Sequence, residues 1–569
     1  MLYQADLCNG QYKNPVLYAD YSDPDAIRVG DDYFMVASSF SNAPAIPLLH
    51  STDLVNWRVV NYVCDALPEY RYINPQHGSG VWAPAIRHHG GEFFVFFPMP
   101  DEGIYVSRTR DPYGKWSAPA LILHEAGVID PCPFWDDDGK LYMVSAVSGA
   151  RKGYNSVLRL TCLDPVSLLP LSDNKIIYDG RGTIYETIEG PKVHKRGGRY
   201  YIFAPAGGVK GGFQAVLRAD NIEGPYEIRV CMRQGDAKTN GPHQGAWVDT
   251  VTGQDFFIHF QDVYACGRIA HLQPMCWRDG WPVIGRPVAG QTWGEPVDTY
   301  DKPDVRVRPE EPCEPENSDD FEGERLSYMW QWNANPDDGW YELEPEKSAI
   351  RLNAVRANAL RQLSDIRNLM LTKWAAPQFC ASMKMNVENL KAGDVAGMVS
   401  LGMIFGGIGL RKNVYGDFEV VLISGSQEFD CQEAFTKSEE TLWPVDEQKL
   451  LEAHYNILFE YNVEVTSRVD VLERKNCLGV EVWVKNSPRE TITMRAYYLT
   501  DGVKSEIDGA VLTFPARAGR WVGVKYGPFC YNKPLAGTET ADASAPVKPD
   551  EAQRGYVTVD YVHVTGGRA

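Results

Sequence analysis

The sequence lacks the segments that would direct it into or across a membrane. Its first ten residues, MLYQADLCNG, hold no basic region followed by an apolar run, so no signal peptide is predicted. No run of about 18 apolar residues suggests a spanning helix. We therefore expect a cytoplasmic protein as the sequence is written, or a periplasmic or secreted one whose leader has been removed.

Paired cysteine motifs are also missing, and positive charge is scarce. The 12 cysteines form no CxxC pair and no Cys/His spacing typical of zinc, so we expect buried thiols in a reducing compartment. The formal net charge of −19 makes binding to nucleic acid or an anionic membrane unfavourable. A neutral substrate fits this charge better, and oligomeric state stays open.

Several catalytic motifs are absent as well. The chain has no HExxH helix and no GxSxG elbow. The glycine-rich stretch FGGIGL at 405–410 is not followed by a P-loop Lys-Ser/Thr, and we interpret it as a strand turn. Helical periodicity is nearly absent from residues 11–290, which indicates an all-β fold.

What the chain does contain is a hairpin pattern that occurs five times, at intervals of roughly 40–60 residues. Each copy is a Gly or Asp turn that opens an aromatic, β-branched run. The copies are GDDYFMVASS, GGEFFVFFPM, DGKLYMVSAV, GGRYYIFAPA and GQDFFIHFQD. Repeats of this length with several short strands predict the blades of a five-bladed propeller, with a single sandwich as the alternative.

One residue stands in register before each turn. Asp23, Trp82, Asp130 and Glu189 precede their turns by seven or eight residues, and His243 precedes its turn by ten. Equivalent places in the blades of a propeller converge on one axis. The pattern therefore predicts a central site with three carboxyls, an indole and an imidazole, although a single acid near a turn is more often a strand cap.

The composition divides the chain into three parts. Residues 1–290 are predicted to form the propeller, and residues 291–318 read as a Pro- and acid-rich linker. Residues 319–569 alternate apolar and polar positions, as in Asn456–Val465, which predicts a large β-sandwich.

Three converging acids favour glycoside hydrolysis. That reaction needs one protonated carboxyl to assist the leaving oxygen and one ionised carboxyl to activate water or attack the sugar. Crowding raises the pKa of one carboxyl, which suits a general acid near neutral pH. No cofactor is required for this chemistry. A metal hydrolase is the alternative from the residues alone, with His243 as its lone imidazole.

The ordered motifs resemble glycoside hydrolase family 43, the β-xylosidases and α-L-arabinofuranosidases. They are NPVLYADYSDPDAIRVGDDYFMVASSF, PAIPLLHSTDLVNW, GVWAPAIRHHGGEFFVFF, DPCPFWDDDGKLYMV, IEGPKVHKRGGRYYIFAPAGG and GRIAHLQ. The resemblance implies an exo-acting, inverting enzyme that releases a terminal pentose, β-D-xylose or α-L-arabinofuranose, from plant cell-wall oligo- or polysaccharide.

The same resemblance implies a role for each site residue. Asp23 corresponds to the general base, Asp130 to the acid that tunes pKa and orients substrate, and Glu189 to the general acid. Arg268 corresponds to an arginine that contacts substrate hydroxyls, and the residues that line the sugar pocket are Phe40 and Trp82. His243 matches a histidine that holds a calcium through water in several relatives, although its segment, PHQGAWV, is looser than the usual pattern.

The second domain is similar to the concanavalin-like sandwich that follows the propeller in one branch of the family. That likeness implies a structural calcium near the chain ends, with Asp560 as a candidate ligand; an exposed Asp without a metal is the simpler interpretation. Two other functions stay open. One is a retaining, invertase-like fructosidase, although Gly190 stands where those enzymes usually carry a cysteine, and the other is a non-catalytic carbohydrate-binding protein.

Overall fold

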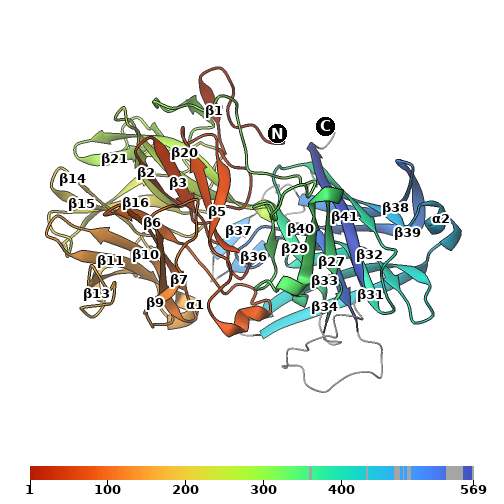
Figure 1. The fold of residues 1–569 in the computed structure, drawn as a ribbon. Coiled ribbons are helices and arrows are strands. Elements are labelled where there is room, and N and C mark those ends of the chain that lie inside the picture. The colour runs from red at the N-terminus through yellow and green to blue at the C-terminus, as the bar shows by residue number, and fades with distance from the viewer. Residues whose placement is uncertain are drawn as a thin grey trace. The chain divides into compact units, whose positions relative to one another are not determined.

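The computed structural model describes residues 1–357, 362–430, 433–466, 474–477, 480–483, 489–533 and 555–566. Two compact units make up the chain (Figure 1). The first consists mainly of Tyr3–Val263 and Gly267–Glu316, and the second mainly of Tyr264–Cys266 and Asn317–Ala569. Each unit is a β structure in its own right.

The first unit is a five-bladed propeller, as the repeats predict. Every blade has four antiparallel strands in chain order, so each blade is a meander that starts at its inner strand, and two further short strands extend the sheet of the fourth blade. The blades are β2(Asp25–Val29) to β5(Arg58–Cys64), β6(Ala85–His89) to β9(Ala120–Leu123), β10(Val128–Trp135) to β13(Lys175–Asp179), β14(Lys192–Arg196) to β17(Glu227–Met232), and β18(His243–Asp249) to β21(Trp281–Ile284).

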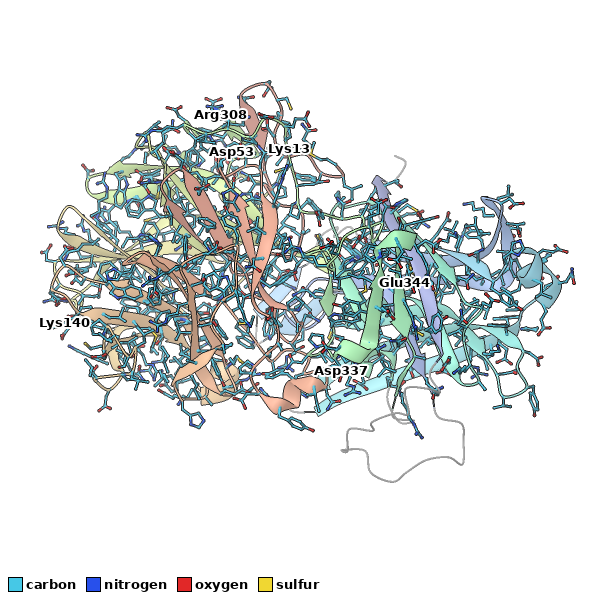
Figure 2. The ribbon with its side chains drawn as sticks, in the orientation of Figure 1. Lys13, Asp53, Lys140, Arg308, Asp337 and Glu344 are labelled. Carbon is cyan, nitrogen blue, oxygen red and sulfur yellow. The ribbon has the colours of Figure 1, made fainter. Side chains whose placement is uncertain are left out.

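The middle strands of the five blades are β3(Asp32–Val36) and β4(Ala45–Ser51), β7(Glu92–Met99) and β8(Gly103–Thr109), β11(Leu141–Val147) and β12(Val157–Leu163), β15(Arg199–Ala206) and β16(Phe213–Ala219), and β19(Asp255–Val263) and β20(Gly267–Arg278). The predicted Gly and Asp turns join the first two strands of each blade. Figure 2 shows Lys140, which follows one such turn between β10 and β11, at the periphery of the unit.

Separate hydrophobic cores fill the spaces between neighbouring blades. Strand β7 shows how one strand serves two of them, because its side chains alternate between its two faces. Phe93, Val95 and Phe97 belong to the core shared with the first blade. Phe94 and Phe96 belong to the core shared with the third blade. The aromatic runs that predict the hairpins are therefore interblade packing, which uses much of the aromatic content.

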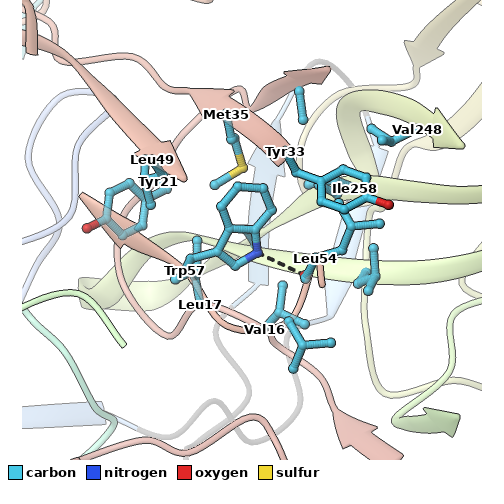
Figure 3. Close-up of a cluster of buried hydrophobic side chains, with 14 of the residues drawn as sticks. Val16, Leu17, Tyr21, Tyr33, Met35, Leu49, Leu54, Trp57, Val248 and Ile258 are labelled. Carbon is cyan, nitrogen blue, oxygen red and sulfur yellow. Dashed lines mark hydrogen bonds between the residues drawn. The ribbon is translucent and has the colours of Figure 1, made fainter. Parts of the chain in front are cut away.

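The core between the last blade and the first closes the ring (Figure 3). Tyr33 and Met35 of β3 pack there with Val248 and Ile258 of the fifth blade. Trp57 lies in this core without exposure to solvent, and its indole N–H donates a 2.8 Å hydrogen bond to the Leu54 carbonyl. The polar edge of this large side chain is thus satisfied while its rings fill the space between blades.

Backbone hydrogen bonds also join the first residues of the chain to the last blade and the segment after it. Strand β1(Gln11–Lys13) pairs with β24(Thr299–Asp301), and Leu17 forms an isolated bridge with Ala270 of the fifth blade. The Tyr21 N–H donates to the Arg268 carbonyl at 3.0 Å. The segment that leads to Asp23 is therefore attached to the strand that carries Arg268.

Part of the segment predicted to be a linker belongs to the first unit instead. Residues 291–318 contain β23(Gly294–Glu295), which pairs with β17 and with β22(Arg286–Pro287), and β24, which pairs with β1. Further on, the Cys313 N–H donates to the Asn56 side chain at 2.9 Å. These contacts could not be predicted from the Pro- and acid-rich sequence. The segment makes them through its backbone groups, so its side chains show no periodic pattern of apolar residues.

The second unit contains two large sheets. One has the order β25(Gln331–Trp332), β29(Met370–Lys373), β40(Lys525–Asn532), β31(Asp394–Leu401), β32(Ile404–Lys412), β33(Phe418–Asp430) and β34(Glu433–Pro444), and β28(Val355–Arg356) pairs with β40. The other has the order β26(Tyr341–Glu344), β27(Ala349–Asn353), β41(Tyr556–Gly566), β30(Phe379–Asn386), β35(Asn456–Thr466), β38(Arg489–Thr500) and β39(Val503–Pro515). A separate hairpin joins β36(Arg474–Cys477) and β37(Val480–Trp483).

Helices are few and short, which agrees with the all-β prediction. In the described ranges the α-helices are α1(Gly149–Lys152) and α2(Glu447–Glu452), and the 3-10 turns are η1(Tyr70–Ile73), η2(Tyr264–Cys266), η3(Asp338–Trp340), η4(Pro345–Lys347) and η5(Leu363–Asp365). None of the helices in the described part of the chain has the length and apolar character needed to span a bilayer.

We predict that Trp57→Ala lowers the stability of the first unit by about 3–5 kcal/mol, because it removes a buried indole from the core that closes the ring. Thermal unfolding followed by calorimetry measures this as a lower melting temperature of the propeller transition. Tyr70→Ala, at a side chain that is 69% exposed, is the matched control and should leave that transition unchanged. Equal effects from both variants would contradict the assigned role of the closing core.

Candidate active site

The predicted site residues lie where the inner strands begin, and the backbone there takes an uncommon conformation. Asp23 and Asp130 both have φ of 54°, Gly190 has 58° and Gln244 has 36°. Positive φ is rare for residues other than glycine and costs conformational energy, so it persists where the surroundings impose it. These blades therefore hold the residues beside their inner strands in a similar strained geometry.

Asp23 lies just before β2 and is almost fully buried. Both of its carboxylate oxygens accept hydrogen bonds. Arg268 Nη1 donates to Oδ1 at 2.8 Å. The hydroxyls of Ser22 and Ser38 donate to Oδ2 at 2.9 and 2.6 Å. A guanidinium and two hydroxyls that donate to one carboxylate fix its orientation.

Asp130 is the third residue of β10, at a point where the pairing register with β11 shifts. Its Oδ2 accepts the Gly190 N–H at 2.8 Å, and its Oδ1 lies 3.5 Å from the Gln244 side-chain amide. The backbone N–H of the residue that follows Glu189 therefore donates to the carboxylate of Asp130. This bond attaches the segment that carries one acid to the next acid in the ring.

Glu189 precedes β14, and within the described ranges no Lys or Arg lies at salt-bridge distance from its carboxyl group, although the charge of Arg268 acts on it from farther away. The carboxyl group lies beside His243 instead, whose Nε2 is 3.5 Å from Glu189 Oε1. The Glu189 side chain keeps 32% of its exposure, whereas His243 is fully buried at the start of β18. Burial and the neighbouring charge of Arg268 lower the pKa of His243 to about 3, so its imidazole is neutral and forms no ion pair with Glu189.

The electrostatics of the three acids differ in a way that suits acid–base chemistry. Burial, followed by the charges of Asp130 and Asp23, raises the pKa of Glu189 well above the usual range for a glutamate. Burial and the charge of Asp23 also raise the pKa of Asp130, against the opposing effects of the Gly190 N–H and Lys192. Glu189 is therefore the carboxyl best placed to keep a proton at neutral pH.

Phe40 and Trp82 lie close to each other between the first two blades. Phe40 has φ of 53° and exchanges two backbone hydrogen bonds with Val81, which joins the first two blades next to the indole. The two rings lie 6.3 Å apart, and the guanidinium of Arg151 lies 5.1 Å from the Trp82 ring centroid. This gives an aromatic pair with a cation beside it, a surface suited to the apolar face of a sugar.

The sequence analysis missed four residues that the structure places in this cluster. Ser22 and Ser38 donate to Asp23, Gln244 contacts Asp130, and Arg151 covers Trp82. Ser22 is next to an acid in the sequence, so its position was a usable signal. Ser38 lies in the first of the quoted motifs and Gln244 lies in PHQGAWV, so both were also within reach of sequence reasoning, whereas Arg151 comes from a segment with no motif.

The described residues do not fit a directly bound metal ion. They contain no group of three or more His, Cys, Asp or Glu side chains arranged to hold one. Asp560, the candidate calcium ligand, pairs with Lys384 at 2.6 Å, whereas calcium takes roughly six to eight oxygen ligands. The calcium interpretation of Asp560 is therefore unsupported, and a contact of His243 with a metal through water stays a prediction.

Comparison with known proteins identifies the chain. The model of glycosyl hydrolases family 43 matches residues 12–282. A relative from Xylanibacter ruminicola that is named for β-xylosidase activity is 39% identical over 413 residues, which cover 72% of this chain and 74% of the relative. The chain belongs to glycosyl hydrolase family 43. It is an exo-acting glycoside hydrolase of this inverting family, so the fructosidase and binding-protein alternatives are set aside.

The family 43 match extends to the second unit. Residues 318–544 match the β-xylosidase C-terminal concanavalin A-like domain, which confirms the predicted sandwich type. A non-reducing end α-L-arabinofuranosidase of Bacteroides ovatus is 28% identical over 421 residues, 68% of this chain and 74% of that protein. A solved bifunctional GH43–CE protein of Bacteroides eggerthii aligns with a TM-score of 0.74 and 27% identity. That alignment covers 98% of this chain and 64% of the other chain.

Gly190 gives a direct test of the site geometry. At its φ of 58°, an added Cβ would lie 2.8 Å from the Gln244 side chain, too close to be accepted without movement. We predict that Gly190→Ala lowers kcat/KM on a substrate that the wild type cleaves by about tenfold or more, because it displaces the N–H that binds Asp130.

Gly197 supplies the matched control for this variant. It has nearly the same φ, 57°, in the hairpin turn, but an added Cβ there meets no atom within 4 Å. Gly197→Ala therefore carries the same backbone strain without the clash and should keep wild-type kcat/KM. If both variants lose activity equally, strain alone explains the loss and the Gly190–Asp130 contact is not critical.

Proposed function

We propose that this family 43 enzyme removes a terminal pentose, β-D-xylose or α-L-arabinofuranose, from oligo- or polysaccharides of the plant cell wall. The observation that carries the proposal is the difference between the surroundings of two acids. Arg268 and two hydroxyls bind Asp23, whereas Glu189 has a raised pKa and no Lys or Arg at salt-bridge distance in the part of the chain that the structure describes. The relatives named for β-xylosidase and α-L-arabinofuranosidase activity support both sugars.

In this proposal Glu189 is the general acid and Asp23 the general base. Glu189 donates its proton to the leaving glycosidic oxygen, while Asp23 takes a proton from the water that attacks the anomeric carbon from the opposite face. Asp130 raises the pKa of Glu189 and orients substrate. Arg268 orients Asp23 through its hydrogen bond and can also donate to sugar hydroxyls, and Phe40 and Trp82 pack against the sugar ring.

A panel of aryl glycosides tests the substrate class. We expect release of p-nitrophenol from aryl β-xyloside or aryl α-L-arabinofuranoside, and monosaccharide alone from the matching oligosaccharide. Proton NMR of the first-formed sugar should show an anomer inverted relative to the substrate. Activity on neither pentoside, or early accumulation of internal fragments, would sink the proposal.

Two variants separate the roles of the acids. Glu189→Ala should lose about 10²–10⁴-fold in kcat on substrates with poor leaving groups, and much less on those with good leaving groups, which need little protonation. Asp23→Ala should lose activity on all of them, and azide should restore turnover with a glycosyl azide of inverted configuration. The reverse pattern would exchange the two assignments.

A further inference from the structure

Arg151, in the short helix α1, lies beside the aromatic pair of the site but has no part in the mechanism described so far. Its guanidinium is 5.1 Å from the centroid of the Trp82 ring, and its Nε donates to Asp101 Oδ1 at 3.0 Å. Within the described ranges its two Nη groups have no hydrogen-bond partner, and neither is buried away from solvent. Two charged donors next to Trp82 are therefore left for a ligand.

Asp101, in the loop between β7 and β8, holds this guanidinium in place. Its Oδ2 accepts a hydrogen bond from Arg71 Nη2 at 2.9 Å, so one carboxylate lies between two arginines. Burial alone would raise the pKa of Asp101, but the hydrogen bonds from the two arginines and from Ser79 lower it to about 2. The carboxylate is thus ionised at neutral pH, where it keeps its bond to Arg151.

The backbone around Arg151 is attached to the segment that leads to Asp130. An added Cβ at Gly127, three residues before this acid, would lie 3.1 Å from the Arg151 Cβ. The Gly127 N–H donates to the Pro100 carbonyl at 2.7 Å, and the Ser148 N–H donates to the Gly127 carbonyl at 2.9 Å. Helix α1, the loop that carries Asp101 and the entry to β10 are therefore packed together next to the acids.

We propose that Arg151 is a specificity-determining residue whose two Nη groups donate to neighbouring hydroxyls of the terminal pentose that packs on Trp82. This inference rests on the proposed function and adds a contact to the same site. A guanidinium offers donors in a fixed planar fork, which matches two oxygen acceptors that lie side by side. Because Asp101 and Trp82 hold the side chain before substrate arrives, it loses little conformational freedom on binding.

The surrounding charges favour neutral hydroxyls over a carboxylate as the acceptors. Arg151 shares Asp101 with Arg71. Arg71 also pairs with Glu102 at 2.5 Å, so two cations meet two anions in this cluster. An acidic sugar would gain little net attraction there, and the formal net charge of −19 opposes its approach. A neutral pentose with vicinal hydroxyls accepts from both donors without that opposition.

The test measures how tightly the full-length enzyme binds the pentose that it releases, as the inhibition constant Ki of that free sugar. We expect Arg151→Met, which removes the donors and keeps an extended side chain, to raise this Ki about tenfold or more. The KM of the aryl pentoside should rise by a similar factor with a smaller change in kcat, because the acids are untouched. A merely structural residue would lower the melting temperature and leave Ki unchanged.

Lys152→Met is the matched control in the same helix. Lys152 pairs with Glu125 at 2.9 Å, so this variant removes a neighbouring cation and an ion pair but no donor beside Trp82. Its Ki for the pentose should equal that of the wild type, and an equal rise in both variants overturns the proposal. An unchanged Ki in Arg151→Met also overturns it, even if the KM of an oligosaccharide rises, because Arg151 would then contact the leaving-group sugar.

Arg151→Lys covers the case in which the methionine variant folds poorly. Lysine keeps the charge and can still pair with Asp101, but it lacks the fork of paired donors. We expect a stable enzyme in which the Ki of the pentose is still raised, and a wild-type Ki refutes the assignment. A wild type that is inactive on both pentosides instead marks failure of the proposed function, and the inference falls with it.

Discussion

Three neighbouring carboxyl groups, two buried and one part-exposed, repel one another, and the active site follows from how each charge is offset. Asp23 meets Arg268 and two serine hydroxyls, and Asp130 meets a backbone N–H and the field of Lys192. Glu189 lies beside a neutral imidazole instead. The repulsion that remains is useful, because it raises the pKa of the carboxyl that must donate a proton.

The propeller supplies this arrangement because each inner strand delivers one short, strained segment to the axis. Five interblade cores fix the strands relative to one another, and the hydrogen bonds between blades reach the acids themselves, as at Gly190 and Asp130. Packing and electrostatics are therefore coupled here, since a shift of one blade would alter the pKa of its neighbour's acid.

The propeller and its three acids could be predicted from the sequence, because the blades repeat and each acid precedes its turn by a nearly constant number of residues. The environment of each acid could not be predicted, since Arg268 of β20 and Ser38, which follows β3, approach Asp23 from other parts of the chain. The prediction that the glycine-rich stretch at 405–410 is a strand turn is wrong, because the stretch lies inside β32. There a Cβ at Gly406 would collide with the Phe514 ring, a packing constraint that no local pattern reveals.

The bond between Asp23 and Arg268 joins residues separated by 245 positions. During synthesis the first four blades emerge with all three acids present, but the guanidinium that organises the first of them arrives only with the fifth blade. Such a long loop must close before the contact stabilises anything, which is typical of slow, late steps in β folding. The chain thus gains its chemical competence at the end of folding rather than blade by blade.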